Sequence, residues 1–131
     1  MHLINRETDY AVRALCYLAR HPRDIVPVAR LCAEAHTPRP YLRRILQTLA
    51  KAGMLDSFRG KGGGFRLRKS VSGIRLADVM EIFQGNPDFT RCVFRNKVCP
   101  RQSTCPLRKK IKAIEKRAVA ELRATTIASL I

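Results

Sequence analysis

The chain has 131 residues, 46% of them hydrophobic, and 26 Lys and Arg against 10 Asp and Glu give a formal net charge of +16. This length predicts one compact domain or a small domain with an appended element, and the lack of a long apolar run or a secretory signal predicts a cytoplasmic protein without membrane spans. The positive charge predicts a polyanionic partner, most often nucleic acid, with a ribosome or an acidic membrane surface as alternatives.

The first helix is expected between Thr8 and about Arg20. Apolar residues recur there at three- and four-residue spacing, which indicates one buried face. Thr8 is the predicted N-cap, and Asp9 in the first turn is favoured by the helix dipole. The His-Pro pair at residues 21 and 22 is predicted to end the helix.

Two further helices are predicted in close succession. The first covers residues 28–35, and a tight break at residues 36 and 37 separates it from the second. The second helix starts near Pro38, closes at Gly53 and is predicted to bury a stripe formed by Leu42, Ile45, Leu46 and Leu49. Two helices joined by a few residues, the second rich in arginine, indicate a helix-turn-helix.

A basic hairpin is predicted directly after this pair of helices. Residues 55–59 and 65–68 have strand-like composition and flank a glycine-rich turn. Between residues 38 and 70 there are nine Lys or Arg against one acid, Asp56. Such an asymmetry favours an electrostatic binding face over an ordinary solvated surface, which is the alternative. The hairpin is therefore predicted to be the wing of a winged helix.

The basic residues of the third helix and the wing predict contacts with duplex DNA. The start of the third helix would enter a major groove, where an arginine can donate two hydrogen bonds to guanine. The wing would contact backbone phosphates or an adjacent minor groove. The predicted DNA-binding residues are Arg39, Tyr41, Arg43, Arg44, Arg59, Lys61, Arg66 and Arg68.

The last third of the chain is predicted to hold two helices and a loop. A helix from about residue 74 ends at Gly85, and residues 86–104 show no apolar periodicity. A final helix starts at Pro106. Its apolar stripe has coiled-coil-like spacing and is predicted to form a dimer seam, with packing against the chain's own winged domain as the alternative. The seam residues are Leu107, Ile111, Ile114, Ala118 and Leu122.

Three of the five cysteines lie in the loop or at its end, with the spacing Cys-x6-Cys-x5-Cys. An odd cysteine count without a secretory signal argues against a disulfide framework. Thiolates bind zinc or iron–sulfur clusters, and zinc usually takes closely paired cysteines, which are absent here, so the spacing favours an object larger than a single ion. A structural zinc ion or a metal-free loop remains the alternative. The other two, Cys16 and Cys32, fall on apolar helical faces and are expected in the core.

The order of these parts resembles a known family. The segments TDYAVRAL, PYLRRILQTLAKAGML, RGKGGGFRL and IRLADVMEIF, followed by three cysteines, are similar to the Rrf-two (Rrf2) family of winged-helix transcriptional regulators that includes IscR, NsrR and RirA. The resemblance covers nearly the whole chain. It implies a dimeric bacterial repressor whose operator affinity depends on a 4Fe–4S or 2Fe–2S cluster that senses nitric oxide, oxygen or iron.

The resemblance also implies a set of cluster ligands. Cys92, Cys99 and Cys105 match the three cysteines of the family. IscR-like members have a histidine three residues after the last cysteine, but this chain has Arg108, which stays protonated and cannot ligate. Some NsrR-like members take an acidic ligand from the first helix of the partner, and Asp9 occupies that place. Helix-dipole stabilisation is an alternative role for Asp9, and Glu7, His2, His36 or a small exogenous molecule are further candidate ligands.

These inferences combine into one expected architecture. The fold class is mainly α with a small β-hairpin wing, as a winged helix-turn-helix plus a C-terminal dimerisation helix. The expected division is a DNA-binding domain at 1–85, a cysteine-containing loop at 86–104, and a dimerisation helix with a tail at 105–131. The expected partners are a double-stranded DNA operator and a second copy of the chain. The expected location is the bacterial cytoplasm, on the nucleoid, and no motif of an enzyme is present.

Overall fold

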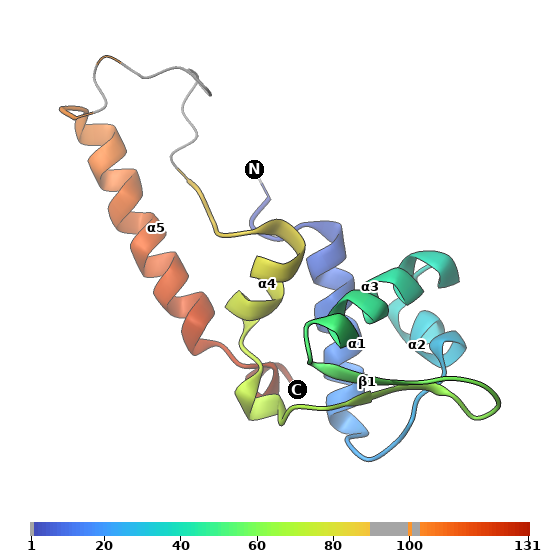
Figure 1. Cartoon of the computed structure of the whole chain (residues 1–131). Coiled ribbons are helices and arrows are strands. Elements are labelled where there is room, and N and C mark those ends of the chain that lie inside the picture. Colours follow the sequence, from blue (N-terminus) through green and yellow to red (C-terminus); the bar gives the residue numbers. More distant parts are fainter. Residues whose placement is uncertain (1, 90–99, 101–102) are drawn as a thin grey trace.

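The helices and strands follow the predicted order. The computed structural model describes residues 2–89, 100 and 103–131. Its helices are α1 (Arg6–Arg20), α2 (Val28–Ala35), α3 (Arg39–Lys51), α4 (Leu76–Gln84) and α5 (Pro106–Ala124). The strands are β1 (Leu55–Phe58) and β2 (Gly64–Leu67), and two short 3-10 helices are η1 (Val71–Gly73) and η2 (Ile127–Leu130). The chain is therefore mainly α-helical with one small hairpin, as predicted (Figure 1).

The core lies between α1 and α3, with α2, α4 and the hairpin around it. The predicted stripe of α3 is confirmed, because all four of its members are almost completely buried: Leu42, Ile45, Leu46 and Leu49. Leu15 and Leu18 of α1 are fully buried against the same cluster. Burying a leucine side chain stabilises a fold by about 1.5–3 kcal/mol, so this cluster fixes the position of α3.

The start of α1 differs from the prediction. The N-cap is Asn5, whose Oδ1 accepts a hydrogen bond from the Thr8 amide at 2.8 Å. Thr8 lies inside the helix and is fully buried, and its hydroxyl donates a hydrogen bond to Gln84 Oε1 at 2.8 Å. The prediction of Thr8 as the cap was wrong because asparagine caps at least as well as threonine, and because the partner of Thr8 lies on a distant helix.

The hairpin is an antiparallel pair with Leu55 opposite Leu67 and Phe58 opposite Gly64. It also pairs with the connection between α1 and α2. The Val26 amide donates to the Phe65 carbonyl and the Phe65 amide donates to the Val26 carbonyl, both at 2.9 Å. This pairing with Val26 ties the hairpin to the helices, so the wing holds a fixed place beside α3 (Figure 1).

Helix α5 contacts α4, and its N-terminal end lies far from the helices of the core (Figure 1). Two members of the predicted seam, Leu107 and Ile114, are 68% and 48% exposed, whereas Leu122 near the other end is buried. Among the described residues, no helix combines the length and apolar character needed to cross a membrane. Two of the five residues of the apolar stripe of α5 are thus largely uncovered by the described part of the chain.

The residues after α5 return to the winged-helix part. The Leu76 amide donates to the Thr125 carbonyl at 2.8 Å, and the Ile127 amide donates to the Ile74 carbonyl at 2.9 Å. Ile127 is fully buried in the same core as α1 and α3. The C-terminal end of α5 is therefore anchored. The division at 1–85, 86–104 and 105–131 stays a prediction, although the tail packs with the first of these units.

Candidate nucleic-acid interface

A groove of about 760 Å³ separates α3 from the hairpin. Its α3 side is formed by residues four apart in sequence, which lie along one stripe of a helix: Arg39, Arg43, Gln47 and Lys51. Its hairpin side includes Arg59 and the backbone of the glycine-rich turn. No carboxylate is among the residues that line the groove. The groove is therefore a positively charged channel suited to a polyanion.

Four of the predicted DNA-binding residues are free for an external anion. Arg39, Arg43, Arg59 and Lys61 are exposed. Within the described part of the chain, none of the four is within ion-pair distance of a carboxylate. Arg39 and Arg43 extend from α3, and Arg59 and Lys61 extend from the turn of the hairpin. Arg39, Arg43 and Arg59 line the groove, and Lys61 lies in the turn of the hairpin, outside the lining.

Tyr41 and Arg44 lie on another edge of α3, which faces α1. The Tyr41 ring is half-buried and meets the Tyr10 ring edge to face, with 5.7 Å between centroids. The Arg44 guanidinium lies 5.4 Å from the centre of the Tyr41 ring and 4.0 Å from a Glu7 carboxylate oxygen. These two predicted residues therefore do not line the groove.

Arg66 of β2 and Arg68, the residue directly after that strand, are held by neighbours on β1. Arg66 lies over the Phe58 ring at 4.9 Å, and Arg68 is 3.7 Å from Asp56. Both side chains reach the surface of the hairpin rather than the groove. Gln47 and Lys51 also line the groove but were not among the predicted residues, although their spacing of four and eight from Arg43 was a readable signal.

Cys105 is the described member of the cysteine segment, and Cys92 and Cys99 lie outside the described residues. It is a free, half-buried thiol at the N-cap of α5, and its side chain makes no capping hydrogen bond. A helix N-terminus favours negative charge, which suits a thiolate ligand. Among the described residues, no three His, Cys, Asp or Glu gather closely enough to hold a metal ion. Asp9, the predicted fourth ligand, pairs with Arg13 at 3.0 Å.

Cys16 and Cys32 pack against the core, in agreement with the expectation from sequence. Burial raises the pKa of the Cys16 thiol, and Arg20 partly opposes this effect. Burial also raises the pKa of Cys32, with Arg39 acting in the opposite direction. Both residues therefore stay protonated at neutral pH and are poor metal ligands.

Glu115 of α5 is a residue that the sequence did not single out. Its carboxylate accepts a hydrogen bond from the Phe89 amide at 2.8 Å, and its side chain is only 16% exposed. Lys112 lies 3.7 Å from the same carboxylate. This contact ties the segment that follows α4 to the middle of α5. Phe89 and Glu115 are far apart in sequence, so no local periodicity predicts their contact, and only the packing reveals it.

Comparison with known proteins gives a family match over nearly the whole chain. The family described as "Rrf2: Iron-dependent Transcriptional regulator" matches residues 4–131. Protein aau3 of Rhizobium meliloti (strain 1021) is 30% identical over 105 residues, which are 79% of this chain and 68% of that protein. A protein of Aquifex aeolicus (strain VF5) that is described as an HTH-type transcriptional regulator is 29% identical over 124 residues, which are 93% and 86% of the two chains.

Solved structures share the fold at lower identity. CymR (YrzC), the global cysteine regulator of B. subtilis, superposes with a TM-score of 0.81 at 20% identity, covering 99% of this chain and 96% of that one. T. potens IscR superposes with a TM-score of 0.77 at 22% identity, covering 98% of this chain and 85% of that one. At these identities the likeness establishes the winged-helix architecture.

Proposed function

Because the chain belongs to the Rrf2 family of transcriptional regulators, we propose that it is a homodimeric repressor whose affinity for a DNA operator is set by an iron–sulfur cluster. The observation that carries the DNA-binding part is the acid-free basic groove between α3 and the hairpin. The cluster part depends on the three cysteines that end at the start of α5. The protein would act on the nucleoid, in the cytoplasm.

In this proposal the DNA backbone runs along the groove. Arg39 and Arg43 reach from α3 toward base edges and phosphates of a major groove, and an arginine there can donate a bidentate pair to guanine. Arg59 and Lys61 on the hairpin neutralise phosphates of the adjoining backbone. Because the hairpin is fixed to the Val26 segment, both sets of cations approach DNA as one rigid surface.

The exposed stripe of α5 supports a dimer. Leu107 and Ile114 stand largely in solvent in the single chain, which is unfavourable for large aliphatic side chains unless a partner covers them. A second α5 with the same stripe would bury both sides of the seam at once, as a twofold axis requires. Two winged-helix units would then face two half-sites of an operator.

The residues fit an iron–sulfur cluster in their chemistry. Cys92, Cys99 and Cys105 would hold it as thiolates, and Asp9 of the partner subunit would supply a fourth, carboxylate ligand. Cys105 is free and lies at the N-terminus of a 19-residue helix, where negative charge is stabilised. Asp9 lies at the exposed start of α1, and ligation would replace its pair with Arg13.

The proposed switch follows from the position of Cys105. When bound, the cluster supplies a group that nitric oxide, oxygen or iron shortage can change. Cys105 is the N-cap residue of α5, so the state of its thiol bears directly on the N-terminal end of the proposed dimer helix. Regulation requires that the two states of the protein differ in affinity for DNA, and a change in half-site spacing would provide that difference.

Anaerobic purification followed by iron and sulfide analysis tests the cluster. The wild type should be brown and contain both elements, and Cys92→Ala, Cys99→Ala and Cys105→Ala should each lose them. Cys16→Ala is the matched control and should keep the colour, because Cys16 packs against the core, away from the cysteine segment in sequence. One zinc without sulfide would instead support a structural metal. A colourless wild type whose DNA binding is unaltered in all three variants would overturn the sensor.

A further inference from the structure

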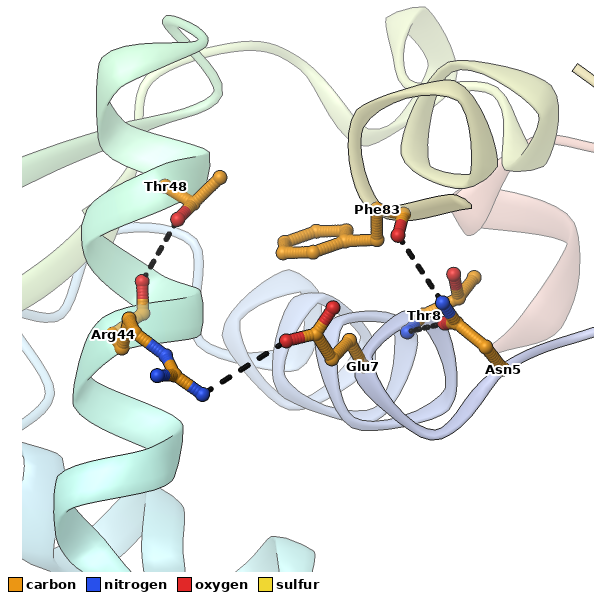
Figure 2. A network of polar contacts seen from close by, with 6 residues as sticks. All are labelled: Asn5, Glu7, Thr8, Arg44, Thr48 and Phe83. Carbon is orange, nitrogen blue, oxygen red and sulfur yellow. Dashed lines mark hydrogen bonds and ion pairs between the residues drawn. The ribbon is translucent and has the colours of Figure 1, made fainter. Parts of the chain in front are cut away.

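Glu7 of α1 is an acidic residue at the edge of the basic surface formed by α3 and the hairpin. Within the described residues, only two ion pairs involve α3 or the hairpin, and one of them joins Glu7 of α1 to Arg44 of α3 across 4.0 Å. The side chains of Glu7 and Arg44 are 38% and 69% exposed, so the Arg44 guanidinium is accessible from solvent. Figure 2 shows the Glu7 carboxylate directed toward the Arg44 guanidinium.

Arg44 has a second partner on the same side. Its guanidinium lies over the Tyr41 ring at 5.4 Å, and that ring is in turn fixed edge to face against Tyr10 of α1. Both contacts lie on the side of α3 that packs against α1, and Arg44 is not among the residues that line the groove. Arg39 and Arg43 on the same helix have no carboxylate within ion-pair distance among the described residues. Arg44 is therefore restrained where its neighbours on α3 are free.

The helix turn that carries Glu7 is itself anchored. Asn5 caps α1 and donates from Nδ2 to the Phe83 carbonyl at 3.1 Å, at the end of α4 (Figure 2). Gln84 accepts from the Asn5 amide at 2.9 Å and from the Thr8 hydroxyl at 2.8 Å. These bonds hold the backbone of the turn in place. The fold thus holds the backbone of Glu7 within reach of Arg44, and the pairing costs the side-chain entropy of the two residues alone.

We propose that Glu7 competes with DNA phosphates for Arg44 and so limits the affinity of the protein for DNA. This inference rests on the proposed DNA-binding function. Each phosphate that a cation neutralises releases counterions and steepens the dependence of binding on salt. While Glu7 holds Arg44, one phosphate contact per protomer is not fully made. The competing interpretation is that Glu7 only stabilises the first turn of α1 through the helix dipole.

Binding to a mixed-sequence DNA duplex of about 30 base pairs, measured by fluorescence anisotropy over a series of KCl concentrations, separates the two interpretations. Glu7→Gln should bind up to about five-fold tighter at low salt, the range expected for losing one exposed ion pair. The slope of log K against log salt should steepen by about one per protomer. In an Arg44→Gln background the same Glu7→Gln change should alter neither quantity.

Glu121→Gln is the control for charge alone, because it removes one exposed carboxylate from α5. Equal tightening in this control, an unchanged slope in Glu7→Gln, or an effect that persists without Arg44 would overturn the inference. A thermal unfolding curve of each variant verifies folding. Arg44→Gln alone supplies an independent test, since it should reduce the wild-type slope by less than Arg43→Gln does, and an equal reduction would count against the restraint.

The same titration separates this inference from the proposed function. A wild type that does not bind DNA in a salt-dependent manner would overturn the DNA-binding function, and the inference with it. A wild type that binds with a steep slope, alongside an unchanged Glu7→Gln variant, would overturn the inference alone.

Discussion

Gly64 shows how a single residue fixes the place of the wing. It opens β2 with a φ of +155°, and a Cβ atom there would overlap the carbonyl oxygen of Val26. The close approach exists because the Val26 segment pairs with Phe65, the next residue along the chain. Only glycine allows this contact without moving backbone, so the groove between α3 and the hairpin depends on it.

Gly64→Ala should therefore destabilise the protein by about 1–3 kcal/mol, because strained backbone and a backbone clash must be relieved together. Urea unfolding measures the change. Gly73→Ala is the matched control: a Cβ there meets nothing within 4 Å. Its effect should stay within about 0.5 kcal/mol. Equal losses in the two variants would contradict the packing of the hairpin against Val26.

The two half-buried thiols, Cys16 and Cys32, give a prediction about pH. Burial raises the pKa of Cys16 and of Cys32, so at any pH below the raised value each has a smaller thiolate fraction than a free cysteine. Metal-free protein should be alkylated by iodoacetamide slowly at these two positions near pH 7, with rates rising about tenfold per pH unit. Mass spectrometry of labelled peptides reads the rates. Rates equal to those of the urea-unfolded chain would show that neither thiol is protected.

At the scale of elements, features that depend on local sequence patterns were predictable, whereas features that depend on contacts between elements were not. The residue range of α2 and the buried stripe of α3 were readable because apolar spacing and a break at residues 36 and 37 are local features. The start of α1 was not, because Thr8 bonds to Gln84, a residue 76 positions away. The same difference separates the predicted DNA-binding residues into two groups. Arg39 and Arg43 line the groove, whereas packing of α1 on α3 draws Tyr41 and Arg44 aside.

Helix α5 provides the prediction at the level of an element. Ile114→Glu places a charge in the middle of the proposed seam, where Ile114 is 48% exposed in the single chain. Burying that charge against a second copy is unfavourable, so the dimer should dissociate into monomers at micromolar concentration. Sedimentation velocity measures the mass.

Ala113→Glu is the control for this substitution, because Ala113 is exposed and is not a member of the predicted seam. It should leave the dimer intact. If α5 instead packed against its own winged domain, Ile114→Glu would lower the free energy of unfolding and leave the mass unchanged.

At the scale of the whole molecule, the charge of +16 acts through its distribution. Arg39, Arg43, Lys51 and Arg59 converge on one groove without a carboxylate, whereas α5 carries basic residues outside that groove. Composition alone predicted a polyanionic partner. It could not tell which cations share a surface, because that depends on how α3 and the hairpin pack.

The last prediction follows from this difference. Arg43→Gln should weaken binding to DNA and reduce the slope of log K against log salt by about one per protomer, because one phosphate-facing cation is lost from the groove. Arg117→Gln removes the same charge from an exposed position of α5 and should change the slope by much less. Anisotropy titrations at several salt concentrations measure both. Equal slopes for the two variants would mean that DNA responds to the total charge of the protein, and that the groove between α3 and the hairpin is not the binding surface.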